Sequence, residues 1–141
     1  TNLLLDVMPT IDTPIGPSNR WYGAALANAG DYSIEGQPVR AITPVYFVAT
    51  KIEAFRGRGN GDFQASHDME DLLAVLGGIE ALRKAIASAQ DDPGRAIRSQ
   101  VIEWRANDDF MDALAGHFTG DHAGQAVASA VRAWILSLAN P

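Results

Sequence analysis

Residues 46–76 read YFVATKIEAFRGRGNGDFQASHDMEDLLAVL, a stretch that sets three basic side chains against a close-set acidic cluster. Lys51, Arg56 and Arg58 come first, accompanied by the glycines of GRGNG, and the acidic residues follow within Ser66–Asp71. A second helix is expected to begin at this acidic segment. Cations, glycines and carboxylates in this order suit a polyphosphate and its metal ion.

Helical periodicity is expected on both sides of this loop. Pro44 is acceptable in a first helical turn, and apolar residues then recur at intervals of three and four residues. This spacing predicts a helix that carries Lys51. The apolar stripe consists of Val45, Val48, Ile52 and Phe55. The same periodicity predicts further helices over residues 66–76, 79–89, 93 to about 114, and 123–138.

The N-terminal part has a different pattern, because short apolar or alternating runs are separated by Pro and Gly. We expect a buried strand over Leu3–Met8, a short helix from an N-cap at Ser18 or Asn19 through Ala29, and a hairpin with strands at 31–35 and 39–42 around a Gly36-Gln37 turn. About three strands are therefore predicted.

These elements predict an α/β (α+β) fold with a small N-terminal sheet and a mainly helical C-terminal half. The length of 141 residues suits one domain, 1–141, with a strand and hairpin part at 1–43 and a helical part at 44–141. None of the breaks between the predicted helices is long enough to mark a domain boundary.

Composition excludes several classes of protein. The net charge of -6 argues against a general DNA-binding protein, because nonspecific phosphate contact needs a positive face. No cysteine is present, which excludes thiolate metal sites and fits a reducing compartment. No apolar run approaches the length of a membrane span, so no membrane partner is expected and a cytoplasmic location is predicted.

Two interpretations of the charged residues stay open from the pattern alone. Asp68 and Asp71 project from one face of a helix start, where they could hold a divalent ion or could stabilise the first turn through the helix dipole. The basic side chains could bind phosphate or form a solvated helix face. If Lys51 and Asp68 share one cleft, their side chains should converge.

The histidines and tryptophans favour structural roles. His67 at a helix start is expected to be a surface or capping residue, and the spacing of His117 and His122 matches no metal motif built on adjacent helical turns. Trp21, Trp104 and Trp134 lie within helical periodicity, which favours packing over base stacking.

Four segments together resemble the polymerase β-like nucleotidyltransferases, in particular the AbiEii-like branch of abortive-infection and type IV toxin–antitoxin systems. They are LLDVMP at Leu4–Pro9, SNRWY at Ser18–Tyr22, ATKIEAFRGRG at Ala49–Gly59 and SHDMEDL at Ser66–Leu72. The resemblance covers most of the chain and implies a truncated form of the nucleotidyltransferase fold.

The resemblance implies transfer of a nucleoside monophosphate from an NTP to a hydroxyl, with magnesium as cofactor and an antitoxin as a possible partner. It implies a metal-binding role for Asp6, catalytic roles for Lys51 and Asp68, and substrate-binding roles for Arg56, Arg58 and Asp71. Positioning and charge neutralisation dominate such chemistry, which agrees with the residue types present.

One part of the family pattern is absent from these 141 residues, namely the glycine-serine turn and the D-x-D pair that precede the third carboxylate. Asp6 alone supplies too few ligands for magnesium, so we expect no transfer by this chain unaided. Three alternatives follow. The chain could be part of a larger enzyme, or a naturally short binding or regulatory module that kept the Lys51 and Asp68 cleft but lost catalysis. It could also be an interaction protein that pairs with a copy of itself or with a partner through an open strand edge near Leu3–Val7.

Overall fold

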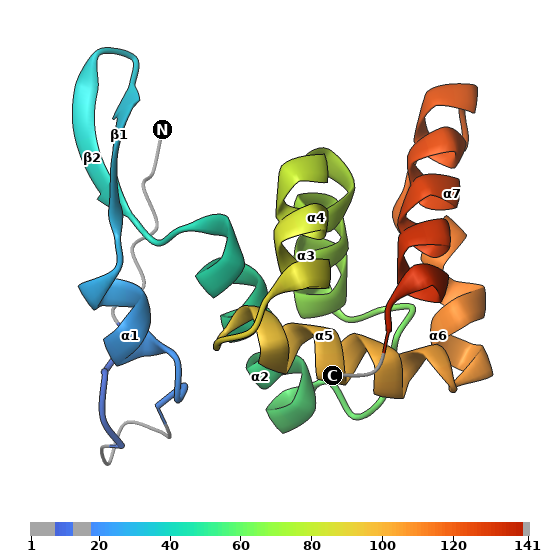
Figure 1. The fold of residues 1–141 in the computed structure, drawn as a ribbon, viewed down its shortest axis with the longest axis horizontal. Helices are drawn as coiled ribbons and strands as arrows, with labels where there is room; N and C mark the ends of the chain where they lie inside the picture. The colour runs from blue at the N-terminus through green and yellow to red at the C-terminus, as the bar shows by residue number, and fades with distance from the viewer. Residues whose placement is uncertain (1–7, 13–17, 140–141) are drawn as a thin grey trace.

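A short β-hairpin projects from a group of packed helices (Figure 1). The computed structural model describes residues 8–12 and 18–139. Along these residues the elements are α1 (Tyr22–Ala27), β1 (Gly30–Ile34), β2 (Gln37–Ala41), α2 (Pro44–Arg58), α3 (His67–Gly78), α4 (Glu80–Ser88), α5 (Gly94–Arg105), α6 (Asp108–Ala113), the 3-10 helix η1 (Leu114–His117) and α7 (His122–Ser137). The fold is α+β in this coarse sense, as predicted.

The core lies between the helices and is built from the apolar faces that the periodicity predicted. The fully buried side chains of greatest volume are Phe110, Met69, Leu72, Leu73, Leu76, Ile86, Ile97, Leu114, Ile135, Val48, Val101 and Val131. Phe63, in the loop between α2 and α3, packs between Phe55, Trp104 and Phe110 with ring centroids 5.0–5.8 Å apart. Burial of such rings anchors this loop to the core.

The predicted tryptophan packing is confirmed. Trp104 is buried, and Trp21 and Trp134 are partly buried against the core. The indole N–H of Trp134 donates to the Arg83 carbonyl at 2.9 Å.

The hairpin pairs β1 with β2 in antiparallel register, Tyr32 opposite Val39. Glu35 and Gly36 both have positive φ, 50° and 79°, so they are the two turn residues. The predicted turn was therefore displaced by one residue, because a two-residue hairpin loop requires positive φ at both central positions. The predicted strand at Leu3–Met8 lies outside the described residues except for Met8, which is not in a strand.

The N-cap prediction for the first helix was wrong. α1 begins at Tyr22, with Trp21 at the N-cap position and no side-chain cap. Asn19 instead accepts a hydrogen bond from the Trp21 amide at 3.1 Å and donates one to the Thr50 carbonyl at 2.8 Å. Its amide therefore ties the start of α1 to α2.

The single helix predicted from residue 93 to about 114 is divided in two. α5 ends at Arg105, and Asn107 adopts an extended conformation in which its side chain accepts from the Asp109 amide at 2.9 Å. Asparagine competes well for such N-cap positions, and the apolar periodicity on both sides conceals the break.

Several arginines satisfy carbonyls near helix ends. Arg83 donates to the carbonyls of Leu76 and Gly77 at the end of α3, and Arg98 donates to those of Ala87 and Ala89 at the end of α4. Similar bonds join Arg105 to Leu138 and Arg132 to Met111. The final carbonyls of a helix lack intrahelical partners, so these guanidiniums have structural roles.

Gly77 and Gly78, which were predicted to separate the helices at 66–76 and 79–89, belong instead to α3. A Cβ on Gly77 would approach Phe118 at 2.6 Å and Val127 at 2.9 Å, whereas a Cβ on Gly78 would meet nothing within 4 Å. Gly77 is thus a point of close packing, and Gly78 is not.

We expect Gly77→Ala to destabilise the protein by about 1–3 kcal/mol, because the added methyl overpacks the contact with Phe118 and Val127. Gly78→Ala is the matched control and should be neutral or stabilising by up to about 1 kcal/mol through helix propensity. Urea unfolding followed by tryptophan fluorescence measures both. Equal effects of the two substitutions would contradict the packing role of Gly77.

Candidate functional site

Lys51 and Arg58 lie on one face of α2, because seven residues correspond to almost two full helical turns. The helix forms as the apolar stripe predicted, with Val48, Ile52 and Phe55 buried. It extends through Arg58, so Gly57 is helical and the loop begins only at Gly59. The two cations therefore project from a rigid element.

The carboxylates come from the first two turns of α3. Ser66 caps this helix by accepting from the Met69 amide at 3.4 Å, which places Asp68 and Asp71 on one face. Met69, Leu72 and Leu73 are buried on the core side. Because α3 packs against α2, this face of α3 is brought to Lys51 and Arg58.

Four side chains meet there, and we name Lys51, Arg58, Asp68 and Asp71 the charge cluster. Arg58 forms a bidentate salt bridge with Asp68: Nε donates to Oδ2 and Nη2 donates to Oδ1, each at 2.8 Å. Lys51 Nζ lies 3.3 Å from Asp68 Oδ1 and 2.5 Å from Asp71 Oδ2. The predicted convergence of Lys51 and Asp68 is confirmed.

Burial makes Asp68 the centre of the charge cluster. Its side chain is 6% exposed, whereas that of Arg58 is 66% exposed. A carboxylate so far from water requires partners for its charge, and charge-assisted hydrogen bonds from a planar guanidinium provide them. Both oxygens of Asp68 are occupied, so the chemical capability of this residue is to orient cations.

The ionisation of the charge cluster follows from these contacts. The hydrogen bond from Arg58 is the largest influence on Asp68, and with Lys51 it outweighs burial and lowers the pKa of Asp68. For Lys51, burial is the largest single influence and disfavours its charge, but the contacts with Asp71 and Asp68 together outweigh burial and raise its pKa. Asp68 and Lys51 are therefore both charged at neutral pH.

A cavity of about 470 Å³ adjoins the charge cluster. Lys51, Arg58 and Asp68 line one side of this cavity. The loop between α2 and α3 and the start of α3 line the rest, through Gly59, Asn60, Asp62, Ala65, Ser66 and His67. Asn60 and Gly61 have positive φ, 49° and 72°, which turns the chain sharply after α2. Asp62 accepts from the Gln64 and Ala65 amides at 3.1 and 2.9 Å, which holds the second half of the loop.

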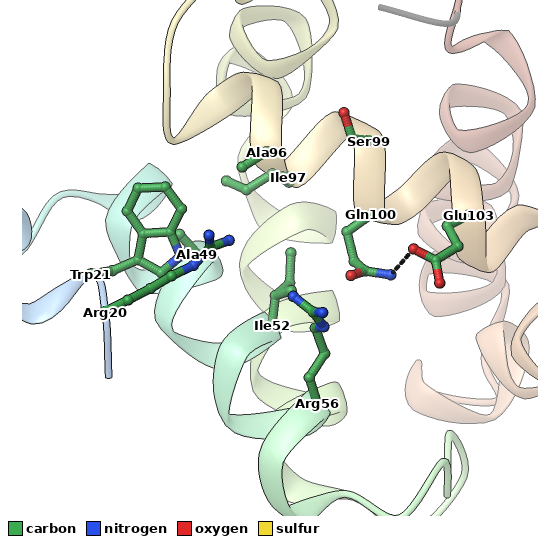
Figure 2. A pocket seen from close by; sticks show the side chains of 10 residues that line it. All are labelled: Arg20, Trp21, Ala49, Ile52, Arg56, Ala96, Ile97, Ser99, Gln100 and Glu103. Carbon is green, nitrogen blue, oxygen red and sulfur yellow. Dashed lines mark hydrogen bonds between the residues drawn. The ribbon is translucent and has the colours of Figure 1, made fainter. Parts of the chain in front are cut away.

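Arg56 is not part of this site, which corrects its predicted grouping with Arg58. Two residues along a helix are about 200° apart around its axis, so the two guanidiniums project from opposite faces. Arg56 lines a second pocket, between α2 and α5 (Figure 2). The sequence spacing already contained this distinction.

The histidines add one contact that the sequence did not indicate. His117 Nε2 lies 2.6 Å from the Phe63 carbonyl, so η1 supports the loop that walls the cavity. His67 is highly exposed and lies 3.3 Å from Glu70, which fits its predicted surface role. Only tertiary structure could reveal a contact across 54 residues.

The carboxylates of the charge cluster do not fit a magnesium ion, because Lys51 and Arg58 already contact both oxygens of Asp68 and one oxygen of Asp71. Within residues 8–12 and 18–139, no three His, Asp or Glu side chains are placed to hold a metal ion. Asp6, for which the resemblance implies a metal-binding role, lies outside the described residues.

Comparisons of the chain with protein-family models, curated proteins and solved structures found no match. The nucleotidyltransferase resemblance therefore stays a prediction. Along the part of the chain that the structure describes, no helix has both the length and the apolar character needed to cross a membrane.

We expect Asp68→Asn to lower the free energy of unfolding at neutral pH, because it removes the carboxylate that Arg58 and Lys51 stabilise. A lowered folded-state pKa means that this stabilisation is complete above the unfolded-state value, about pH 4. It is lost as pH falls through the folded-state pKa. The difference between wild type and variant should thus shrink in acid, as measured by urea unfolding across pH.

Glu70→Gln is the matched control, since Glu70 lies on the same helix but is exposed and, among the described residues, its carboxylate pairs with exposed His67. It should show little difference at any pH. A pH-independent effect of Asp68→Asn would contradict the assigned ion pairing.

Proposed function

We propose that this chain is a nucleotidyltransferase-like domain that binds the triphosphate of an NTP at the charge cluster. The observation that carries the proposal is the fixed pair of cations, Lys51 and Arg58, on the wall of an open cavity. Phosphate binding requires cations held in position with donors left over, and this geometry meets both conditions.

A count of donors supports the proposal. Arg58 has five N–H donors and directs two at Asp68, while Lys51 has three and faces two carboxylates. Each cation thus keeps at least one donor beyond those carboxylates. The exposure of Arg58 leaves its remaining donors accessible from the cavity.

Asp68 and Asp71 have a positioning role in this proposal. They hold the two cations close together against the repulsion between their like charges. The two cations and two carboxylates of the charge cluster balance in formal charge. An incoming triphosphate accepts hydrogen bonds from the donors of Lys51 and Arg58 that the carboxylates leave unused. The catalytic role predicted for Asp68 becomes one of orientation.

In this proposal, these 141 residues bind the nucleotide. Transfer of the nucleoside monophosphate requires, in addition, the metal-binding carboxylates of the family. The glycine-serine turn and the D-x-D pair are not within this sequence. An acceptor hydroxyl, an antitoxin partner and a cytoplasmic location stay predictions.

We expect the protein to bind a Mg–NTP and Lys51→Gln to weaken this binding about tenfold or more, since a charge-assisted contact to phosphate is lost. Isothermal titration calorimetry with ATP, GTP, CTP and UTP measures the affinity and identifies the base. Incubation with labelled NTP should give no incorporation into RNA or protein acceptors.

Lys84→Gln provides the matched control, because Lys84 is an exposed lysine on α4 paired with Glu80 at 2.7 Å. Its affinity should equal that of the wild type. The proposal fails if no NTP binds or if the two lysine variants lose affinity equally.

A second function, an interaction module that self-associates, is favoured by the hairpin. Tyr32, Val39 and Ala41 share one face of the two strands with Ile34, whose side chain is 59% exposed. That face continues into an apolar hollow of about 400 Å³ bordered by Phe47 and other residues of α2 and α3. A two-stranded hairpin gains stability when such a face is covered.

If the hairpin mediates self-association, Ile34→Asp should shift a dimer towards monomer in sedimentation equilibrium, because the charge would be buried at the contact. Leu136→Asp is the control, since Leu136 is comparably exposed, 56%, on α7. A wild-type protein that is monomeric at all concentrations, or equal effects of both substitutions, would contradict this function.

A further inference from the structure

A second pocket lies on the opposite side of α2 from the charge cluster, between the start of α1, α2 and α5 (Figure 2). Its volume is about 290 Å³, which suits a small ligand. Ile52 and Ile97 with the small side chains of Ala49 and Ala96 line it. Ala49, Ile52 and Ile97 are almost fully buried, so polar and charged side chains contribute most of the exposed lining.

Two guanidiniums border the pocket, Arg20 beside Trp21 and Arg56 on α2. The Arg20 guanidinium carbon lies 4.6 Å from the centre of the Trp21 ring, a cation–π contact that holds it in place. Both side chains are more than half exposed, 58% for Arg20 and 54% for Arg56. They are therefore accessible to a ligand.

One carboxylate serves both guanidiniums. Glu53 Oε2 lies 3.0 Å from Arg20 Nε and 3.9 Å from Arg56 Nη1, and it is buried without a well-aligned hydrogen bond among the described residues. Within the same part of the chain, no hydrogen bond engages the Nη groups of Arg20 or any guanidinium nitrogen of Arg56. Most donors on both arginines are thus available.

The opposite wall adds a polar group at a fixed position. Gln100 extends from α5 towards α2, and its amide nitrogen donates to Glu103 at 3.0 Å (Figure 2). This bond sets the orientation of the amide and leaves its oxygen directed away from Glu103. Two guanidiniums with unused donors and one oriented amide are polar groups of the kind that orient a ligand in a small-molecule site.

We infer that this pocket binds a small organic oxyanion, with the anionic group between Arg20 and Arg56 and an apolar part beside Trp21. A carboxylate and a phosphate ester share this chemistry, because both accept paired hydrogen bonds from a guanidinium. The site uses none of the charge cluster, so it stands independently of the proposed NTP binding.

The indole N–H resonance of Trp21 provides the test. Nitrogen-15 NMR of the full chain distinguishes its three tryptophans, and Trp21→Phe identifies the relevant peak. Phenyl phosphate, benzoate, inorganic phosphate and neutral phenol are the probes. We expect a saturable shift of the Trp21 peak with phenyl phosphate or benzoate, and the one that binds more tightly distinguishes a phosphate ester from a carboxylate.

Arg56→Gln should weaken the tighter probe about tenfold, and Arg20→Gln should do the same, as each loses a charge-assisted contact. Arg40→Gln, an exposed arginine on β2, should leave the affinity unchanged. Dispersed indole peaks in every variant establish that it is folded. Arg56 is exposed and bound only at 3.9 Å, so its variant keeps the test valid if Arg20→Gln does not fold.

The inference is overturned by any of three results. The first is the absence of a saturable Trp21 shift with both aromatic anions. The second is an equal shift with phenol, which would indicate apolar contact alone. The third is an Arg56→Gln protein that binds as tightly as the wild type.

Discussion

The buried carboxylate of Asp68 is the constraint on which the charge cluster and its cavity depend. An ionised group at 6% exposure is costly unless it is paired and hydrogen-bonded, and Arg58 meets both requirements through two 2.8 Å contacts. Lys51 contributes the third contact. Because these partners come from α2, the pairing fixes how the end of α2 and the start of α3 face each other, and the intervening loop must turn sharply between them.

That loop has its own anchors, which explains why the cavity beside it has a defined wall. Phe63 is buried among Phe55, Trp104 and Phe110, and His117 contacts its carbonyl. An aromatic ring and a backbone contact thus hold the middle of the loop, while Asp62 satisfies two amides beside it. Preorganisation of this kind lowers the entropy that a ligand-binding loop loses on binding.

Seven of the nine arginines divide into two kinds according to the acceptors they meet. Arg83, Arg98, Arg105 and Arg132 donate to backbone carbonyls and stabilise helix ends or junctions. Arg20, Arg56 and Arg58 contact carboxylates and keep unused donors. The net charge of -6 does not reveal this division, because recognition depends on where donors remain free.

The sequence by itself determined the helical half, the hairpin and the burial of the apolar stripes, since these follow from local periodicity and short loops. Only the tertiary structure decided which residues of α5 form a pocket with Arg56, that Gly77 is a packing contact, and that Asn107 caps a separate helix. Each of these depends on neighbours distant in the chain or on competition between two local conformations. Periodicity reports which face of a helix is apolar, but it does not report what covers that face or which acceptor a guanidinium reaches.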